Sequence, residues 1–421
     1  MTLAIFRTTF LPGLIKALLF SVLLTGCSPS LNITGLDISS MYSGQDETAI
    51  HLVNLYNLND STSLISIVIP AGLIKPEPKN SKLQKRRGTL KYEVITSEKR
   101  VRLIDSATFN IADTSLERSF LSHSWTFKAP VGTNYFIKAT YSLPDNPEDL
   151  ILLEFLSKTS KVDYSWYRFQ TEAGDFVPGY VTNYLQPYRL VTSDTTHRCI
   201  IATAYFRNFD LPYPPFTEKY RSLFDYRPDS TFKVLIGDGF SQYFTPAKAG
   251  FYFFPIDSSG RKGPTLFVMN SGFPKVTLHT NMLEALRYLT SGAEYRKLLS
   301  YANPKLAVDS FWIANSGRSD IATELIRKYY RRVETANKLF TSFTEGWKTD
   351  RGMIFLIFGK PAQVFRSFEQ EVWIYGEIND PRALKFYFNK ADNPFTANDY
   401  VLVRHEYFKS IWFQNVQLWR R

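Results

Sequence analysis

A change in the spacing of apolar residues near Asn281 most constrains the fold of this 421-residue chain. Before this position, apolar and polar residues alternate with a period of two, which is typical of half-buried strands. After it, apolar residues recur about every 3.6 positions, as on one face of a helix. The pattern predicts a mainly β N-terminal region of immunoglobulin-like sandwich modules, followed by a C-terminal α+β domain with three helices and a small mixed sheet.

The β-rich region divides into two expected domains. Residues 46–145 contain β-branched and aromatic runs separated by turn residues, at the spacing of an immunoglobulin-like sandwich. Residues 146–278 are expected to form a second β-rich domain, which resembles another small sandwich. Its proline-containing loop, Phe209 to Phe216, carries aromatic side chains that we expect to pack against their own domain, because such side chains bury a large area.

Residues 279–421 are the expected α+β domain. Its three predicted helices are Met282 to Tyr301, Pro304 to Asn315 and Asp320 to Ser342. Asp320 is the expected N-cap of the third helix. One apolar stripe of that helix is predicted to face the core; it consists of Ala322, Leu325, Tyr329, Val333, Ala336 and Phe340. Strands are predicted at Met353 to Phe358, Glu371 to Tyr375, Leu384 to Phe388 and Tyr400 to Arg404.

The most specific motif follows the third helix, where the chain reads Glu345-Gly346-Trp347-Lys348-Thr349-Asp350-Arg351-Gly352. Here the chain resembles the GWxTD-domain proteins of Bacteroidota and related bacteria, whose name describes Gly346-Trp347-x-Thr349-Asp350. The resemblance covers Met282 to Arg421 closely and includes Gly359-x-Pro361 and Glu371-x-Trp373-x-Tyr375. It implies a cell-envelope compartment and an arrangement of β modules before the α+β domain. It implies no reaction, because the family has no assigned biochemical role.

The residues of the motif are typical of a structural junction between the long helix and a sheet. We expect Gly346 to end the helix with a positive φ, and Gly352 to let the chain enter the next strand. Trp347 has the size to cover the junction, and Thr349 and Asp350 are expected to bond local backbone amides. Arg351 is expected to pair with Glu345 or Asp350.

A functional alternative uses the same residues. Glu345 and Asp350 are candidate catalytic carboxylates, with Arg351 and His405 as further members of an acid–base or ligand site. Paired carboxylates act in this way only where their surroundings separate their pKa values. The chain has five histidines and no histidine pair at helical spacing, Cys-x-x-Cys pair, Gly-x-Ser-x-Gly elbow or phosphate-loop spacing. We therefore predict no metal site and no cofactor.

The first residues indicate a lipoprotein signal peptide over residues 1–26. Basic Arg7 and Lys16 accompany an apolar stretch that ends in Leu24-Thr25-Gly26-Cys27. Cys27 is the predicted lipidation site and new N-terminus, with residues 27–45 as a tether. The apolar stretch is too short to span a bilayer comfortably, and the acyl chains, palmitate among them, would anchor the protein. In Bacteroidota lipoproteins, which this chain resembles, an acidic run after the cysteine marks surface export, and its absence favours the periplasmic side of the outer membrane.

Composition restricts the partners. The formal net charge is +11, but an exported protein does not meet nucleic acid, so we predict no nucleic-acid partner. Of the two cysteines, Cys199 is the one that remains after lipidation, and we expect a buried strand thiol there. His197, two residues before it, lies too far along a strand to activate it.

We expect a membrane-anchored, non-enzymatic binding or scaffolding subunit of a bacterial cell-envelope complex, in the class of secretion or outer-membrane assembly machinery. The alternative expectation is an envelope hydrolase or a glycan-binding protein that uses the Glu345 to Arg351 corner. The expected partners are the membrane, through the lipid on Cys27, and an envelope protein complex, with glycan as a further candidate ligand.

Overall fold

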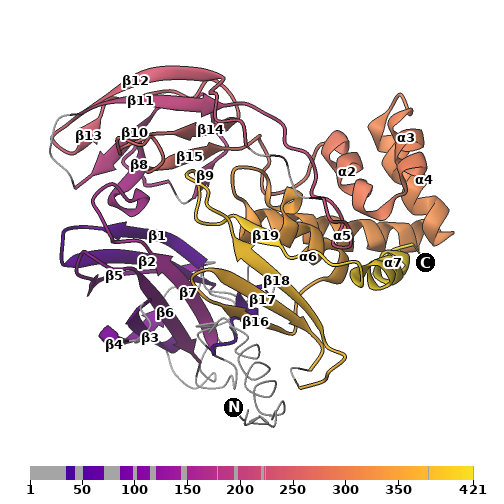
Figure 1. The fold of residues 1–421 in the computed structure, drawn as a ribbon, viewed down its shortest axis with the longest axis horizontal. Helices are drawn as coiled ribbons and strands as arrows, with labels where there is room; N and C mark the ends of the chain where they lie inside the picture. The colour runs from indigo at the N-terminus through magenta and orange to yellow at the C-terminus, as the bar shows by residue number, and fades with distance from the viewer. Residues whose placement is uncertain are drawn as a thin grey trace, which may run out of the picture.

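The protein is described from a computed structural model of the chain. The structure describes residues 35–42, 51–70, 86–97, 102–113, 120–143, 149–177, 179–193, 198–219, 222, 224–377 and 379–420. Cys27, the predicted signal peptide, most of the predicted tether and His197 lie outside the described residues. Within them, a mainly β N-terminal region is followed by a region of helices and a small antiparallel sheet, which confirms the expected fold class (Figure 1).

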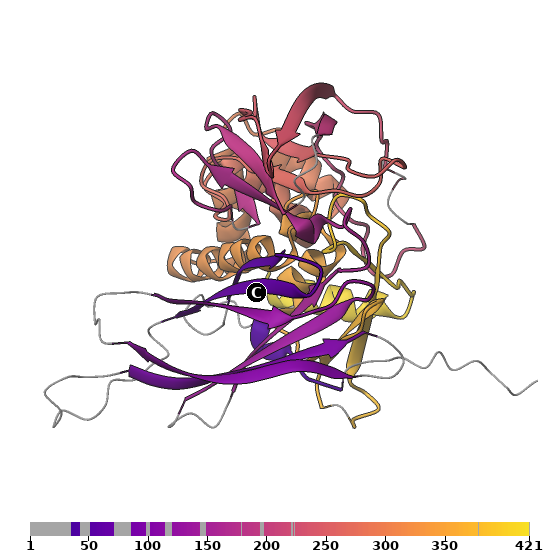
Figure 2. The ribbon, with the colours of Figure 1, turned by 90° about the vertical axis from the view of Figure 1, so that its left-hand side faces the viewer.

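Two antiparallel sheets form a sandwich in the first part of the described chain (Figure 2). One sheet has the order β1-β2-β5, with β1 at His51–Asn57, β2 at Thr62–Pro70 and β5 at Phe120–Lys128. The other has the order β4-β3-β6-β7, with β3 at Arg86–Thr96, β4 at Leu103–Asp113, β6 at Tyr135–Ser142 and β7 at Leu150–Leu156. Alternate residues such as Ile65, Ile67, Leu90 and Val94 fill the space between the sheets, as period-two patterning requires.

The second β-rich part is one continuous sheet of eight strands, where we expected two facing sheets. Its order is β8-β10-β13-β12-β11-β14-β15-β9. The strands are β8 Tyr167–Thr171, β9 Tyr180–Val181, β10 Tyr188–Thr192, β11 Arg198–Tyr205, β12 Ser230–Gly237, β13 Phe240–Ser241, β14 Gly250–Phe253 and β15 Thr265–Val268. The short strand β13 pairs with both β10 and β12 and so joins the two halves. Distant strands share one core, because the sheet curves round it.

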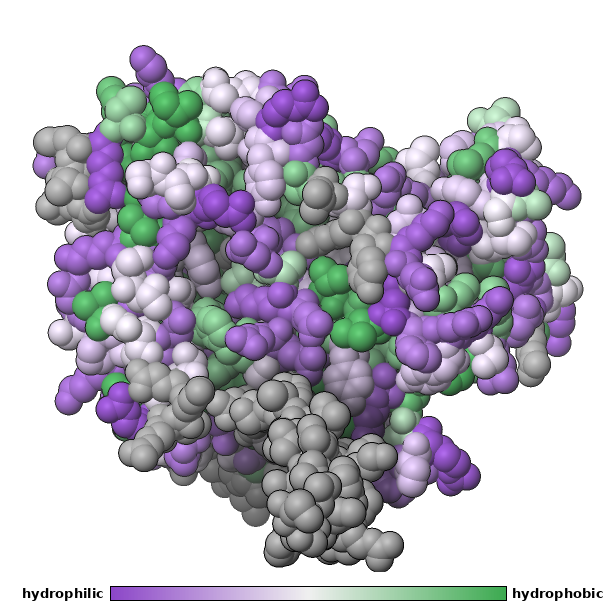
Figure 3. Space-filling model, viewed as in Figure 1, coloured by the Kyte–Doolittle hydropathy of each residue, from purple (hydrophilic) through white to green (hydrophobic). Residues whose placement is uncertain are grey.

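Cys199 is exposed, so the prediction of a buried thiol was wrong. On β11 the side chains of Ile200 and Ala202 face the core, and the alternation of a strand turns Cys199 and Ile201 outward. Leu235 on the paired strand β12 is also exposed. Figure 3 shows hydrophobic surface over the region of β11 and β12 at the upper left, and a further hydrophobic patch near the centre of the same face.

The first predicted helix is broken into three pieces. These are α2 at His279–Ala285, the 3-10 turn η4 at Leu286–Leu289 and α3 at Gly292–Leu299. Ser291 explains the break, because its hydroxyl accepts a hydrogen bond from the Glu294 amide while the Glu294 carboxylate accepts one from the Ser291 amide. This reciprocal capping starts a new helix inside a continuous apolar pattern.

The second and third predicted helices are α4 at Pro304–Ser316 and α5 at Ser319–Phe340. Arg318 is the N-cap residue of α5 and Asp320 lies in its first turn, so the predicted cap was misplaced. The predicted stripe does face the core: Leu325 is half-buried and the other five residues are buried. The remaining helical elements are η5 at Gly346–Lys348, α6 at Asp350–Phe358 and α7 at Phe408–Leu418.

The segment Met353 to Phe358 was predicted to be a strand and is part of helix α6. Residues Asp350 to Ile357 are all buried, so the segment has neither the alternation of a half-buried strand nor the stripe of a surface helix.

The C-terminal sheet has the order β16-β17-β18-β19, with β16 at Gln363–Arg366, β17 at Gln370–Tyr375, β18 at Leu384–Lys390 and β19 at Tyr400–Leu402. All its pairings are antiparallel, so the predicted mixed sheet was wrong in this detail.

The β-rich parts are packed directly onto the helices. The largest core combines α5, α6 and the C-terminal sheet with Phe136 of β6, Leu153 of β7 and Tyr42 of the 3-10 turn η1 at Ser39–Tyr42. A further 3-10 turn, η3 at Tyr164–Trp166, lies beside β1. The loop Phe209 to Phe216 also crosses to the C-terminal domain, where Phe209 packs on Phe343 at 4.7 Å and Phe216 on Phe413 at 5.4 Å between ring centroids. Phe209 also stacks on Phe251 of its own domain at 6.4 Å, as expected, so the loop packs against both domains.

The capping of α3 gives a direct test of the helix break. Ser291→Ala removes the hydroxyl that accepts from the Glu294 amide, and we expect it to lower the free energy of unfolding by about 1 kcal/mol. Denaturant unfolding measures this loss. Ser106→Ala on the exposed edge strand β4 is the control, and equal stability of the two variants would contradict the capping role.

Candidate functional site

The motif residues Gly346 to Gly352 lie where α5, η5 and α6 meet. Trp347 is buried, its ring lies 6.1 Å from that of Tyr288, and its carbonyl oxygen accepts a hydrogen bond from the Tyr288 hydroxyl at 3.1 Å. The Trp347 amide donates to the side-chain oxygen of Asn337 on α5 at 3.4 Å. The tryptophan therefore fixes η5 between α5 and the first helices of the domain.

The two glycines of the motif permit close backbone contact. A Cβ atom on Gly346 would lie 1.9 Å from the carbonyl oxygen of Ala336, and one on Gly352 would lie 2.0 Å from the carbonyl oxygen of Gly346. Gly346 lies inside η5 and does not have a positive φ, so the predicted role as a helix C-terminal residue was wrong. Both positions need glycine because no side chain fits there.

Thr349 bonds local backbone, as expected from its position. Its hydroxyl accepts a hydrogen bond from the Gly352 amide at 3.1 Å and donates to the Gly346 carbonyl at 2.7 Å. It is the N-cap residue of α6, which begins at Asp350. The threonine thus ends η5 and starts α6 with one side chain.

Asp350 makes long-range contacts, whereas we predicted local ones. Its Oδ2 accepts from the Leu402 amide at 2.8 Å and from the Arg404 guanidinium at 3.2 Å, and its Oδ1 forms a second, shorter ion pair with Arg404. Arg404 also donates to the Tyr213 carbonyl at 3.1 Å. The Asp350–Arg404 pair therefore joins α6, the end of β19 and the loop from the second β-rich part.

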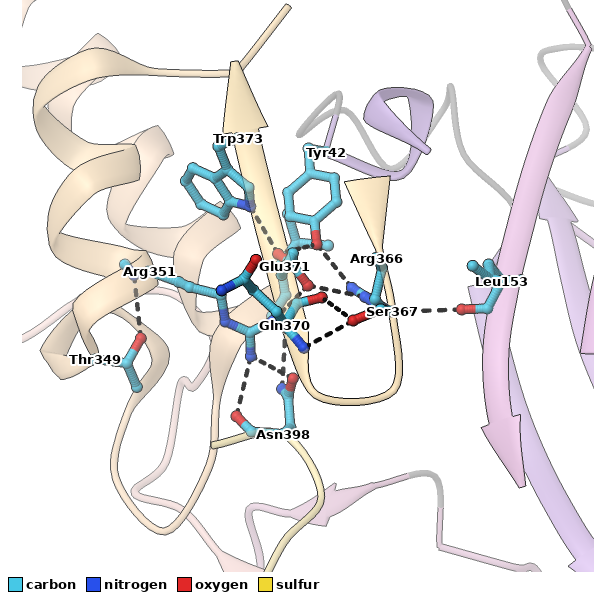
Figure 4. Close-up of polar contacts among 12 residues, drawn as sticks. Tyr42, Leu153, Thr349, Arg351, Arg366, Ser367, Gln370, Glu371, Trp373 and Asn398 are labelled. Carbon is cyan, nitrogen blue, oxygen red and sulfur yellow. Dashed lines mark hydrogen bonds and ion pairs between the residues drawn. The ribbon is translucent and has the colours of Figure 1, made fainter. Parts of the chain in front are cut away.

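Arg351 pairs with Glu371, not with the predicted Glu345 or Asp350. Figure 4 shows Arg351 and Arg366 directed at the carboxylate of Glu371 on β17. Arg351 Nη1 lies 3.2 Å and Arg366 Nε lies 2.8 Å from Glu371 Oε2. The Tyr42 hydroxyl and the Trp373 indole N–H each donate to Oε1 at 2.7 Å. All four contacts converge on a carboxylate that is 0% exposed.

The charges around Glu371 keep it ionised. Burial by itself raises the pKa of this carboxyl group, but Arg366, Arg351 and the two donors at Oε1 lower the pKa to about 2. Arg366 also donates to the Tyr42 hydroxyl at 2.7 Å and to the Leu153 carbonyl at 3.4 Å. Through these bonds the network connects α6, β16 and β17 to η1 and to strand β7 of the sandwich.

Glu345 does not converge with Asp350 and Arg351. Its carboxylate accepts from the Thr344 hydroxyl at 3.1 Å and lies 3.6 Å from the Lys348 ammonium, which also pairs with Glu284 at 3.1 Å. His405 is exposed, and its Nδ1 accepts from the Tyr407 amide at 3.2 Å. The predicted four-residue corner is therefore divided among separate partners, which does not support an acid–base site there.

Glu345 and Trp347 instead line a pocket of about 240 Å³ between the second β-rich sheet and the helices. The pocket walls come from the ends of β11, β14 and β15, from α2 and from the residues around the motif.

No group of three His, Cys, Asp or Glu side chains in the described part of the chain is placed to hold a metal ion. Among the described helices, none is long and apolar enough to cross a membrane.

Several residues of these networks carried little signal in the sequence. The resemblance motif included Glu371 and Trp373, but nothing in the pattern pointed to Tyr42, Arg366, Asn398 or Arg404. Asn398 accepts a hydrogen bond from Arg351 at its carbonyl oxygen at 3.0 Å and donates to the Thr341 carbonyl at 2.9 Å. Such partners meet only after distant parts of the chain are packed together.

Comparison with known proteins gives one family match. Residues 250–421 match a family model described as GWxTD domain. No match is found among curated proteins. Among solved structures, a biofilm-associated protein BSP domain has 11% identity and a TM-score of 0.24 over 54% of this chain and 30% of that chain. Red sea bream transglutaminase has 10% identity and a TM-score of 0.19 over 53% of this chain and 32% of that chain. Likenesses at these scores carry no argument about fold or function.

The Glu371 network predicts a large loss of stability when its carboxylate is removed. Glu371→Ala leaves Arg351 and Arg366 without their shared partner, and we expect the free energy of unfolding to fall by roughly 3–5 kcal/mol. Glu369→Ala is the matched control, because this neighbouring side chain is exposed.

The lowered pKa of Glu371 also stabilises the native state above pH 4.5, and this contribution is lost as the pH falls toward 2.

Acid unfolding therefore provides a second measurement on the same residue. The wild-type chain should lose stability between about pH 4.5 and pH 2, and Glu371→Gln should lose less over that range because it has no carboxyl group to protonate. Denaturant unfolding at a series of pH values compares the two. An identical pH dependence would show that Glu371 does not carry the effect.

The Asp350–Arg404 pair distinguishes a structural role from a catalytic one. Asp350→Asn removes the charge that Arg404 faces, and we expect a loss of about 3 kcal/mol in the free energy of unfolding. Arg404→Gln should have a similar effect, and the double variant should lose less than the sum of the two. A melting temperature close to that of the wild type in Asp350→Asn would instead favour the catalytic alternative.

Proposed function

Because residues 250–421 form a GWxTD domain, we propose that this chain acts as a membrane-anchored, non-enzymatic binding or scaffolding subunit of a bacterial cell-envelope complex. The observation that carries the proposal is that the charged residues of the motif make contacts inside the protein. Asp350 and Arg351 both have their charges paired inside the GWxTD domain, and their partners Arg404 and Glu371 bond in turn to Tyr213 and Tyr42, which lie outside it. The motif thus serves to hold one body together.

A protein whose domains are held together in this way is suited to act as a scaffold. The sandwich, the curved sheet and the helical region each present a separate outer surface (Figures 1 and 2). The Glu371 network and the shared core hold the sandwich on the GWxTD domain, and the Asp350–Arg404 pair holds the loop of the second sheet on it. Partners that bind to different surfaces would therefore be kept at fixed positions relative to each other.

The membrane anchor is the second part of the proposal. Leu24-Thr25-Gly26-Cys27 after an apolar stretch supports lipidation at Cys27 and an outer-membrane lipoprotein that faces the periplasm. A lipid-anchored subunit would bring its complex to the membrane surface without spanning it. Secretion or outer-membrane assembly machinery is the class of partner that we propose.

The hydrolase alternative is less well supported by the geometry. Both oxygens of Asp350 are bonded to Arg404 or to the Leu402 amide, and Glu345 is bonded to Thr344 and Lys348. These bonds direct the two carboxylates toward different side chains, whereas acid–base catalysis needs both to face one substrate. A structural role, in which these residues hold parts of the fold together, explains the same contacts and needs no additional catalytic group.

Affinity purification from crosslinked native envelopes tests the proposal. We expect the tagged wild-type protein to bring down a stoichiometric membrane complex, and Cys27→Ala to lose it, because that variant cannot be lipidated. Cys199→Ala is the matched control, since it removes the other cysteine, which is exposed on β11, and leaves the anchor intact. Recovery of the lipidated protein as a monomer would contradict the scaffolding role.

A further inference from the structure

The pocket beside Glu345 and Trp347 contains polar side chains that the fold does not use. Asn208 follows β11, Asn270 follows β15 and Asn281 lies on α2, and all three line the pocket. None of their side-chain amides makes a hydrogen bond to the described part of the chain. Asn337, which also lines the pocket, differs in donating to the Pro274 carbonyl at 2.8 Å and accepting from the Trp347 amide at 3.4 Å.

Aromatic rings form the other part of the lining. Phe209, Phe267, Phe273 and Phe343 are half-buried and come from different segments of the chain. Phe209 and Phe343 are held edge to face at 4.7 Å, so this part of the wall is braced by its own packing. The pocket therefore presents apolar ring surface next to amides that can both donate and accept hydrogen bonds.

Two of the three charged side chains that line the pocket have ion-pair partners. Glu345 lies 3.6 Å from Lys348, and Arg207 lies 3.4 Å from Asp229. Lys275 is exposed among the lining residues. The amides with unused hydrogen-bonding capacity are neutral, so they suit a ligand that carries several neutral groups able to donate and accept.

From these features we infer that the pocket binds one neutral sugar residue, as a monosaccharide or as the end of a glycan chain. Sugar hydroxyls donate and accept at once and so match the amides of Asn208, Asn270 and Asn281, while the apolar face of a sugar ring packs on an aromatic ring. The volume of about 240 Å³ is below the range of about 300–1,000 Å³ that is common for ligand pockets, which favours a single ring.

The placement of the pocket has a structural consequence. Its walls come from the second β-rich sheet and from the helical region that contains the motif, and ligand sites commonly form where such parts of a fold meet. The motif contributes Trp347 and Glu345 to the lining, whereas Asp350 and Arg351 are committed to their ion pairs. Glycan binding is thus assigned to the pocket and not to the charges of Asp350 and Arg351, and it does not depend on the membrane-anchored role.

Saturation-transfer NMR on the full chain tests this inference. The protein is purified from membranes in a detergent without a sugar headgroup, which would otherwise compete for the pocket. The probes are N-acetylglucosamine, glucose, galactose, mannose, rhamnose and fucose, with glucuronic acid as the anionic comparison. We expect at least one neutral sugar to receive saturation from the protein, and a titration then gives its Kd.

Variants locate the binding. Asn270→Ala with Asn281→Ala removes two of the unused amides, and we expect the affinity for that sugar to fall by about tenfold or more, because each lost hydrogen bond weakens binding several-fold. Asn110→Ala on the exposed face of β4 is the control and should bind as the wild type does. Unchanged melting temperatures would show that the double variant is folded, as expected for amides that bond nothing in the described chain.

Three outcomes would overturn the inference. Saturation of none of the neutral sugars would exclude them as ligands of this pocket. Wild-type affinity in the folded double variant would place the sugar elsewhere. Preference for glucuronic acid, lost in Lys275→Ala, would replace the neutral ligand with an anionic one. None of these results changes the recovery of an envelope complex by the lipidated protein, so this inference and the proposed scaffolding role fail separately.

Discussion

The Glu371 carboxylate is the group on which the arrangement of this protein depends. It is 0% exposed, and a buried charge is tolerated only when it is paired and hydrogen-bonded. The two arginines and two donors that satisfy it come from α6, β16, β17 and η1. Each of these elements must be in place before the charge is compensated. If one element were displaced, the buried charge would be left partly uncompensated at a cost in free energy. This cost couples the GWxTD domain to the residues that precede the sandwich.

The motif that names the domain can be understood in the same way. Gly346 and Gly352 allow η5 to lie against α5 and α6 at distances that a Cβ atom would prevent, and Thr349 begins α6 in the orientation that separates Asp350 from Arg351. Successive residues on a helix point in different directions, so Asp350 faces Arg404 while Arg351 faces Glu371. One short motif thus directs two adjacent charges to two different parts of the molecule.

This use of the motif separates structural residues from candidate ligand-binding residues. The charges of Asp350 and Arg351 are neutralised inside the fold, whereas the side-chain amides of Asn208, Asn270 and Asn281 bond nothing in the described chain and line a pocket between the second β-rich sheet and the helical region. The packing of the loop Phe209 to Phe216 on the GWxTD domain brings the two walls of that pocket together. A binding site here is therefore a consequence of how the second β-rich sheet and the helical region pack together, and neither wall would form it alone.

The sequence by itself determined the features that depend on near neighbours. The change of period near Asn281 separated the β-rich region from the helical one, and the stripe of α5 identified its buried face, because periodicity reports which side of an element is buried. Only the tertiary structure decided the rest. Met353 to Ile357 is buried on all sides and so had no period from which to distinguish a helix from a strand. Arg351 lies next to Asp350 in the sequence, yet its partner is Glu371, which in turn meets Tyr42 from 329 positions away. Partners of buried charges are selected by long-range packing, which local patterns do not encode.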